Sequence, residues 1–516
     1  MHEPRIAIVG LACQYPDAAD SPDALWRNVL SQRRAFRRLP AERLRLDDYL
    51  DAEATSGVSP DTIYSSRAAV LHDYAFDRAR FRIGGHSYRA ADTTHWLALD
   101  VADAALADAG FEGGEGLPRD ETSVVIGNSL TGEFTRAGLM RLRWPYVRRQ
   151  TRAVLRADGL DEAHVETLLE ALERQYKTPF PEPSDESLAG GLANTIAGRI
   201  ANQFDLHGGG FTVDGACASS LLAVTQACSA LAMGDVSVAL AGGVDLSIDP
   251  FELVGFARTG ALARDEMRVF DRRPTGFIPG EGCGIVVLMR LDDALAQGRR
   301  IYAVARGWGV SSDGHGGLTR PETEGQLLAL RRAYRRAGFG PDTVGHFEAH
   351  GTGTAVGDVA ELTTLDRARR EAGARDRAAV STIKGQIGHT KAAAGVAGLI
   401  KATLAVHHQV LPPTPGCHDL HDQLRRDDAT LRVLDTPEAW PTSTPLRAAA
   451  SAMGFGGINT HVVFEGVQNV RRRDLVAVEH TLARTPQDAE LLVLSATDSA
   501  ALADRARTLA ERVAVA

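Results

Sequence analysis

The sequence has 516 residues, of which 44% are hydrophobic and 24% are charged. This composition is typical of a globular protein with several structural units and excludes a mainly disordered chain. The formal net charge of −9 argues against nucleic acid or an anionic membrane as the main partner. Five cysteines are too few for a disulfide scaffold. Because no long apolar run and no signal-like start are visible, we expect a cytoplasmic protein without a membrane span.

Short apolar segments alternate with helical segments along the chain. Alanine-rich helices are predicted at residues 96–110 and 325–338, and an amphipathic helix at 160–177 carries Val165, Leu168, Leu169 and Leu172 on one face. Buried strands are predicted at residues 5–10, 122–127, 236–242, 283–289 and 301–307. This alternation is typical of the α/β class with buried strands.

The main body is expected to span residues 1–465. A polar, arginine-rich connector follows, and it includes Arg471–Arg473. A strand is then predicted at residues 490–495 and a helix at 499–513, with Thr497 or Asp498 as its cap. One strand and one helix cannot bury a core alone, so residues 466–516 are interpreted as a connector and the start of a small α/β domain.

Cys217 lies in a segment that is typical of an exposed nucleophile. An extended stretch, 211–213, leads to this cysteine, small residues surround it, and an alanine- and leucine-rich helix follows. A tight strand-to-helix turn needs such small neighbours. The start of a helix also favours the thiolate through the helix dipole. The alternative is a buried structural cysteine.

His350 ends another predicted strand and precedes alternating glycines and threonines. Gly351 and Gly353 allow a ligand to approach the backbone closely, and Thr352 and Thr354 offer hydroxyls. A dinucleotide-binding loop is disfavoured, because the glycine spacing does not match G-x-G-x-x-G.

His389 lies in a segment that contains two of only four lysines, Lys384 and Lys391. In a chain that otherwise uses arginine, a lysine indicates that an amine itself is needed. Like Cys217, His389 precedes an alanine-rich helix, which suggests an internal duplication. A metal site at Cys417, His418 and His421 is a weak alternative, since the proline-rich surroundings favour a loop.

Phe455 lies in a glycine-rich run, Met453-Gly-Phe-Gly-Gly-Ile-Asn459. Such a run can present backbone N–H groups to a ligand, or it can be an ordinary turn.

Taken together, these four motifs resemble the β-ketoacyl synthase family over about residues 3–465. The resemblance implies the thiolase fold, with two duplicated βαβ halves in a layered αβαβα arrangement. It also implies that residues 466–516 begin the linker domain between ketosynthase and acyltransferase. The sequence around the nucleophile, Asp214-Gly-Ala-Cys-Ala-Ser-Ser220, departs from the D-T-A-C-S-S-S of many modular polyketide synthases. Substrate rules from those synthases are therefore not transferred.

The resemblance implies a role for each matching residue. Cys217 accepts the acyl chain, and the N–H groups of Cys217 and Phe455 form the oxyanion hole. His350 and His389 stabilise the enolate that forms when a malonyl thioester loses CO₂. Lys384 and Glu361 match the supporting residues that orient the two histidines, and Thr352 and Thr354 match the pantetheine contacts. Phe455 also matches the gate beside the acyl pocket. No metal or other cofactor is implied, because phosphopantetheine of an acyl carrier protein carries the substrates.

Further stretches resemble iterative synthases that build enediyne polyene precursors for antibiotics: 8–16, 34–40, 130–136 and 141–146. The alternatives are a ketosynthase of the polyunsaturated fatty acid type and a chain-length or scaffold subunit, which would lack Cys217. A thiolase is disfavoured, because His461 stands where a second cysteine is expected. We expect a homodimer whose partners are the acyl carrier protein and acyltransferase domains of the same synthase.

Overall fold

The computed structural model describes residues 5–51, 60–315, 318–484 and 493–515. Eleven strands form one mixed sheet in the order β12-β10-β9-β14-β15-β8-β1-β7-β6-β4-β5. The strands of this sheet are β1 (Ile6–Gln14), β4 (Thr122–Gly127), β5 (Gly210–Val213), β6 (Val238–Asp245), β7 (Gly282–Arg290), β8 (Ala303–Ser312), β9 (His346–Glu348), β10 (Ala378–Ser381), β12 (Leu431–Arg432), β14 (Arg447–Gly454) and β15 (Ile458–Glu465). Two small ladders pair β2 (Arg37–Arg38) with β3 (Arg67–Ala68) and β11 (Val410–Leu411) with β13 (Glu438–Ala439).

The two ends of the large sheet are parallel, whereas its centre is antiparallel. β4 pairs in parallel with β5 and β6, and β9 pairs in parallel with β10 and β14. Antiparallel pairs join β6 to β7 and β14 to β15 at equivalent places. This repeated arrangement agrees with the predicted two halves, and the predicted α/β class is confirmed. All five strands predicted from apolar runs are present, as β1, β4, β6, β7 and β8.

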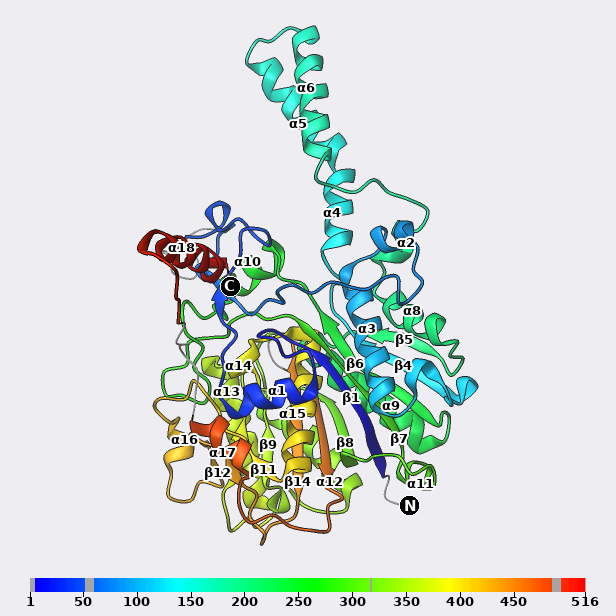
Figure 1. The fold of residues 1–516 in the computed structure, drawn as a ribbon, viewed down its shortest axis with the longest axis vertical. Coiled ribbons are helices and arrows are strands. Elements are labelled where there is room, and N and C mark those ends of the chain that lie inside the picture. Colours follow the sequence, from blue (N-terminus) through cyan, green and yellow to red (C-terminus); the bar gives the residue numbers. More distant parts are fainter. Residues whose placement is uncertain (1–4, 52–59, 316–317, 485–492, 516) are drawn as a thin grey trace.

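Helices pack against the strands of both halves of the sheet (Figure 1). α9 (Ser219–Met233) and α15 (Ala394–His408) pack against each other and against strands of both halves. α3 (Thr93–Asp108) packs on β1 and β7, and α12 (Thr323–Ala337) packs on β8 and β15. The other helices of the body are α1 (Pro22–Leu30), α2 (Gly85–Arg89), α7 (Ser187–Gly191), α8 (Asn194–Phe204), α10 (Pro250–Arg258), α11 (Leu291–Ala296), α13 (Ala355–Glu371), α14 (Lys384–Ile387) and α16 (Asp422–Arg425).

α9 and α15 are apolar on nearly all faces, as expected for helices enclosed by other elements. The segment Ala216–Met233 has the length and composition of a membrane span, but 61% of it is buried inside the protein. Because the core helix of a globular fold passes the same test, the burial of this segment identifies it as part of the core.

The chain that connects β4 to β5 includes a helical arm, which projects from the body (Figure 1). It consists of α4 (Glu133–Leu142), α5 (Trp144–Ala157) and α6 (Glu162–Lys177). Trp144 is buried against Tyr176, with ring centroids 5.4 Å apart, and Val165 and Leu169 are also buried. Leu168 and Leu172 are exposed, so only half of the predicted apolar face of α6 is covered. The sequence did not predict α4 and α5.

Part of the region after residue 465 packs against the body. α17 (Ala477–Arg484) contacts α1, and buried Glu479 forms an ion pair with Arg472. α18 (Ser499–Val515) confirms the predicted helix, and Asp498 caps it by accepting a hydrogen bond from Ala501 N at 2.8 Å. Half of the strand predicted at 490–495 lies outside the described residues, and its described half, 493–495, is not a strand.

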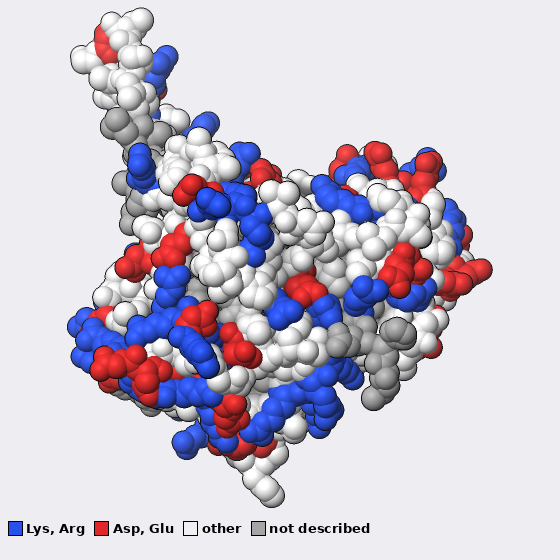
Figure 2. Space-filling view, turned by 90° about the horizontal axis from the view of Figure 1, so that it is seen from below, with Lys and Arg blue, Asp and Glu red and all other residues white. Residues whose placement is uncertain are grey.

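Charges of both signs are interspersed over the face shown in Figure 2. On this face no broad field of one sign covers the residues that are drawn in colour.

Candidate active site

A cavity of about 300 Å³ brings the predicted motifs together. Its walls come from the segments that follow β5, β9 and β14 and from the turn after α14. The predicted residues that line it are Cys217, His350, Thr352, Thr354, Glu361, His389 and Phe455. Four motifs that are far apart in the sequence therefore meet at one place. The carboxyl ends of strands are the usual location of ligand sites in α/β sheets.

Cys217 lies on a tight turn between β5 and α9. The turn is held by Asp214, which accepts a hydrogen bond from Ala216 N at 2.8 Å, and by Ser219 Oγ, which accepts one from Gly215 N at 2.9 Å. Ala216 has a φ of 50°, in the left-handed region that costs a non-glycine residue about 1–2 kcal/mol. Such strain at a reactive residue is typical of functional sites. The predicted nucleophile turn is present.

Cys217 is 8% exposed, and this burial governs the acidity of its thiol. Burial raises the pKa of Cys217 to about 12, although the positive charge of Lys384 acts in the opposite direction. The start of a helix favours the thiolate, but burial acts in the opposite direction and raises the pKa of Cys217. The helix dipole is a modest effect, whereas removing a thiolate from water is costly.

His350 and His389 face each other across the cavity, with ring centroids 5.5 Å apart and ring planes at 85°. Each Nδ1 accepts a backbone hydrogen bond: His350 from Met453 N at 3.3 Å, and His389 from Lys391 N at 3.1 Å. A neutral imidazole that accepts at Nδ1 carries its proton on Nε2. The backbone thus assigns to both rings the tautomer with Nε2–H as donor.

Burial also keeps both imidazoles neutral. It lowers the pKa of His350 well below 6.5, and Lys384 lowers it further. For the pKa of His389, burial again has the largest lowering effect, followed by the charges of Lys384, His350 and Lys391. Two neutral N–H donors are therefore available at neutral pH.

Glu361 holds the loop that carries His350. Its two carboxylate oxygens accept hydrogen bonds from His350 N at 2.7 Å and from Gly351 N at 2.8 Å. Asp358, also in α13, accepts from Gly353 N at 3.0 Å and from Phe270 N at 2.8 Å. Glu361 therefore positions His350 through its backbone, and the structure shows no contact from Glu361 to His389 among the described residues. The sequence analysis missed Asp358, and it did not predict α13, the helix in whose first turn this residue lies.

Lys384 is almost fully buried at the start of α14, close enough to Cys217, Glu361 and Glu348 to interact with their charges. Burial lowers the pKa of Lys384, and the carboxylates oppose this shift. Glu348 is held in turn by Lys401 Nζ at 2.9 Å and by Ile383 N at 2.5 Å. The positive charge of Lys384 thus lowers the pKa of Cys217 and of both histidines.

Phe455, Thr352 and Thr354 also line the cavity. Thr352 Oγ1 and Thr354 Oγ1 are 2.9 Å apart, so the two hydroxyls form one polar patch. Phe455 is 43% exposed, and its ring lies 6.0 Å from that of Phe256. Asn459, from the same glycine-rich run, donates a hydrogen bond to Asp313 Oδ1 at 2.7 Å and fixes the facing loop.

Two other features of the sequence lie elsewhere. His461 is buried in β15 between Ser451 and Tyr334, 2.9 and 3.2 Å away, and it is not among the described residues that line the cavity. His418 Nε2 lies 2.6 Å from Glu266, and His421 caps α16 by accepting from Gln423 N. Cys417, His418 and His421 thus make separate contacts, and the described residues include no cluster of three metal-binding side chains.

Comparison with known families gives two matches. Residues 3–294 match the N-terminal domain of β-ketoacyl synthases, and residues 302–418 match the C-terminal domain. Together these matches cover the cysteine, both histidines and Lys384.

Individual proteins similar to this chain are larger synthases. The chain is 35% identical, over 90% of its length, to a phenolphthiocerol/phthiocerol polyketide synthase protein of Mycobacterium tuberculosis, of which it covers 23%. It is 34% identical, over 96% of its length, to a polyunsaturated fatty acid synthase protein of a Thraustochytrium species, of which it covers 17%. The chain thus spans less than a quarter of these relatives.

Among solved structures, an oxazolomycin ketosynthase domain from Streptomyces albus JA3453 superposes with a TM-score of 0.76 at 31% identity. The match covers 91% of this chain and 76% of that domain. It identifies the large sheet and its helices as the thiolase-type fold of ketosynthases.

Proposed function

Since this chain belongs to the β-ketoacyl synthase family and is a ketosynthase domain, we propose that Cys217, His350 and His389 divide the reaction between acyl transfer and decarboxylation. The observation that carries this proposal is their meeting in one cavity, with a thiol on a strained turn facing two Nε2–H donors. No resident cofactor is needed, because the acyl and malonyl groups arrive on phosphopantetheine of an acyl carrier protein.

Acyl transfer is an exchange of one thioester for another. The sulfur of Cys217 bonds to the acyl carbon, the pantetheine sulfur leaves, and the thiol proton ends on the departing sulfur. A thiol suits this step because it is a strong nucleophile and a good leaving group. The backbone N–H groups of Cys217 and Phe455 are assigned to the oxyanion of this step.

Decarboxylation uses the histidines. The bond between the malonyl methylene and its carboxylate breaks, CO₂ leaves, and the electron pair forms an enolate. The Nε2–H groups of His350 and His389 donate to the enolate oxygen, and neutral donors suffice. The enolate carbon attacks the Cys217 acyl group, and the Cys217 sulfur leaves as the β-ketoacyl thioester forms.

The finer assignment is to an iterative synthase that makes an enediyne polyene precursor. Its support is the resemblance of residues 8–16, 34–40, 130–136 and 141–146 to such synthases. The similarity to a polyunsaturated fatty acid synthase supports the alternative, a ketosynthase of that type, equally well. A chain-length or scaffold subunit is the weaker candidate, because such a subunit would lack Cys217, which is present here in the turn before α9.

The proposed partners are the acyl carrier protein and acyltransferase domains of the same synthase, and the proposed assembly is a cytoplasmic homodimer. Support for the dimer comes from β5, the last strand of the sheet, which is exposed at Gly210 and Phe211. Exposed edge strands offer unpaired backbone groups to a second chain.

The central proposal is tested by loading the full chain with an acyl-pantetheine thioester and measuring its intact mass. We expect one acyl group on Cys217 and none in Cys217→Ala. Cys228→Ala, at a buried position of α9, the helix that follows the Cys217 turn, is the matched control and should load normally. Failure of the wild-type chain to load, or acylation of another cysteine in Cys217→Ala, overturns the assignment.

The finer assignment is tested on the complete synthase by mass spectrometry of its product. A conjugated polyene supports the enediyne type, whereas a chain with isolated double bonds supports the fatty acid type.

A further inference from the structure

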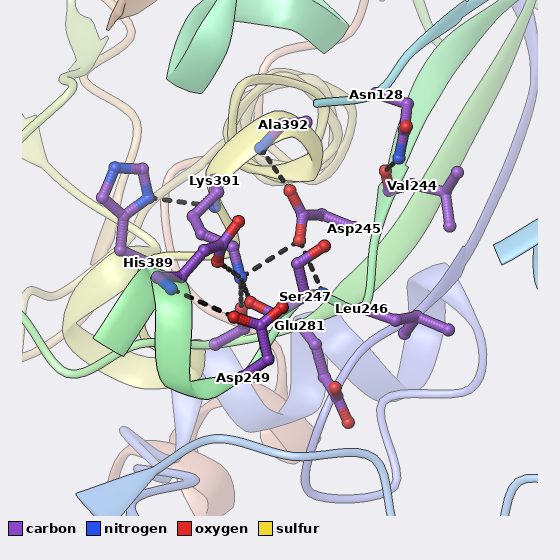
Figure 3. Close-up of polar contacts among 12 residues, drawn as sticks. Asn128, Val244, Asp245, Leu246, Ser247, Asp249, Glu281, His389, Lys391 and Ala392 are labelled. Atoms are coloured by element: carbon purple, nitrogen blue, oxygen red, sulfur yellow. Dashed lines mark hydrogen bonds and ion pairs between the residues drawn. The ribbon is translucent and has the colours of Figure 1, made fainter. Parts of the chain in front are cut away.

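Behind His389 lies a buried group of charges that the mechanism above does not use. Lys391, two residues after His389, is 4% exposed, and its backbone is left-handed with a φ of 46°. Its Nζ lies 3.0 Å from Asp245 Oδ1 and 3.2 Å from Glu252 Oε2. It also donates to Ser247 O at 2.7 Å (Figure 3). One ammonium thereby joins the turn after α14 to the end of β6 and to α10.

The same contacts enclose His389. His389 N donates to Ile278 O at 2.7 Å, and His389 O accepts from Gly280 N at 3.0 Å. Gly280 O in turn lies 3.4 Å from Lys391 Nζ. Asp245 Oδ2 also accepts from Ala392 N at 3.3 Å (Figure 3). The turn that carries His389 is thus fixed on both sides by residues that contact Lys391.

The burial of these three charged side chains is costly in free energy if stability is its only purpose. Asp245 is fully buried and Glu252 nearly so, and two carboxylates face one ammonium. Buried ion pairs commonly contribute little net stability compared with apolar residues of the same volume. What this cluster does provide is a fixed geometry for the backbone N–H that meets His389 Nδ1.

We propose that Lys391, Asp245 and Glu252 form a positioning cluster for His389, which holds its ring so that Nε2–H points at the enolate oxygen. This inference rests on the proposed function. Lys391 contributes in two ways. Its backbone N–H selects the tautomer of His389, and its ammonium group fixes the backbone that carries this N–H. The three residues touch neither substrate nor reacting atoms.

The charge of Lys391 has a second effect. Protonated His389 would carry a hydrogen on Nδ1, facing the N–H of Lys391, and the contact that orients the ring would be lost. The charged groups around the ring are Lys384 from α14, His350 from the loop after β9, and Lys391 itself. All three lower the pKa of His389, after burial, which has the largest effect. Burial lowers the pKa of Lys391, but the charges of Asp245 and Glu252 raise it more and keep the ammonium protonated.

The test compares two steps in the same full-length protein. Acyl loading of Cys217 does not use His389 Nε2–H, whereas release of CO₂ from a malonyl-pantetheine thioester does. In Lys391→Met we expect loading within about threefold of wild type. We expect CO₂ release to fall about 10- to 100-fold, which is the typical loss when a supporting residue is substituted.

The pH profile separates positioning from a merely structural role. In Lys391→Met the lost positive charge raises the pKa of His389 toward its ordinary value. An acid limb in CO₂ release should therefore move upward in pH relative to wild type, while the pH profile of loading stays unchanged.

Two further variants protect the test against misfolding. In Lys391→Met the buried carboxylate of Asp245 loses its ammonium partner, and the double variant Asp245→Asn/Lys391→Met removes that charge. The double variant should therefore restore folding, as judged by the unfolding midpoint, but it should not restore CO₂ release. Arg369→Met removes another buried cation, one that holds loops at Val344, Thr430 and Asp376. It should lower the unfolding midpoint without changing the ratio of CO₂ release to loading.

The cluster is not a positioning device if folded Lys391→Met keeps the wild-type ratio of CO₂ release to acyl loading. The same holds if the double variant recovers CO₂ release. Failure of the proposed function is distinguishable, because the wild-type chain itself would then neither load nor release CO₂.

Discussion

The single side chain with the sharpest expected effect is His389. Its Nε2–H is one of two donors assigned to the malonyl thioester oxygen, while acyl transfer relies on backbone N–H groups that survive a side-chain truncation. Loss of one oxyanion donor typically costs about 10²–10³ in rate. His389→Ala should therefore load an acyl chain within about tenfold of wild type and lose CO₂ release by at least about a hundredfold.

Acyl-enzyme mass and labelled CO₂ from the malonyl thioester measure these two outcomes. If loading and CO₂ release are lost together, His389 serves Cys217 directly as its base, and the division of labour is wrong.

Cys217 should show the reactivity of a buried, neutral thiol. Because burial raises its pKa to about 12, the thiolate fraction increases with pH across the whole stable range of the protein. The rate of alkylation by a neutral electrophile should rise about tenfold per pH unit from pH 7 to 10, without a plateau.

Lys384→Met removes the positive charge that lowers the pKa of Cys217, so alkylation should become slower at each pH. A plateau near pH 7 in the wild type would instead indicate a stable thiolate.

At the scale of elements, the end of β14 and the turn that carries Cys217 are packed backbone to backbone. A Cβ built at Gly454 would lie 2.1 Å from Gly215 O, closer than any real contact. Gly454→Ala must therefore displace the nucleophile turn. We expect acyl loading to fall about 10- to 100-fold, with a loss of stability of about 1–3 kcal/mol.

Gly138→Ala is the matched control for this prediction. Gly138 lies inside α4 with nothing within 4 Å of the added Cβ, so alanine should slightly stabilise the helix. Normal loading by Gly454→Ala would show that the turn tolerates displacement.

The elements that sequence reasoning found are those with strong local signals. β4 was predicted at its observed bounds, and β7 to within one residue, because apolar runs bounded by glycine specify buried strands. α4 and α5 were missed because the many arginines between residues 136 and 156 hide any apolar periodicity. Several of these arginines pair with Glu162 and Glu166 of α6, a partnership that no local pattern reveals.

In the candidate site, too, the residues with a local sequence signal were predicted and those without one were missed. Cys217, His350, His389 and Phe455 carry recognisable flanking residues, and the structure brings them together. Asp245 and Glu252 carry no such flanks, and they reach Lys391 only through the tertiary fold. The protonation state of Cys217 was also beyond the sequence, because it depends on burial rather than on the helix start.

For the whole molecule, the proposed homodimer should depend on β5. Phe211 is 43% exposed on this edge strand, and a lysine there would place a charge where a second chain is expected to pair. Sedimentation at micromolar concentration should show a dimer for the wild type and a monomer for Phe211→Lys. Leu295→Lys, at an exposed position of α11, is the control and should remain dimeric. A wild-type chain that sediments only as a monomer contradicts the proposal.

The place of β1 in the sheet has a consequence for how the chain reaches its native state. Ile6 pairs with Arg290 on one side and with Ala305 on the other, so β1 closes against two strands that are synthesised much later. Contacts between such distant parts of a chain form slowly, because a long loop must close before they contribute. Until the ribosome has passed β8, the apolar residues of β1 lack their native neighbours and remain open to non-native association. We therefore expect folding to be late and slow, and shorter chains that end before Ser312 to aggregate rather than fold.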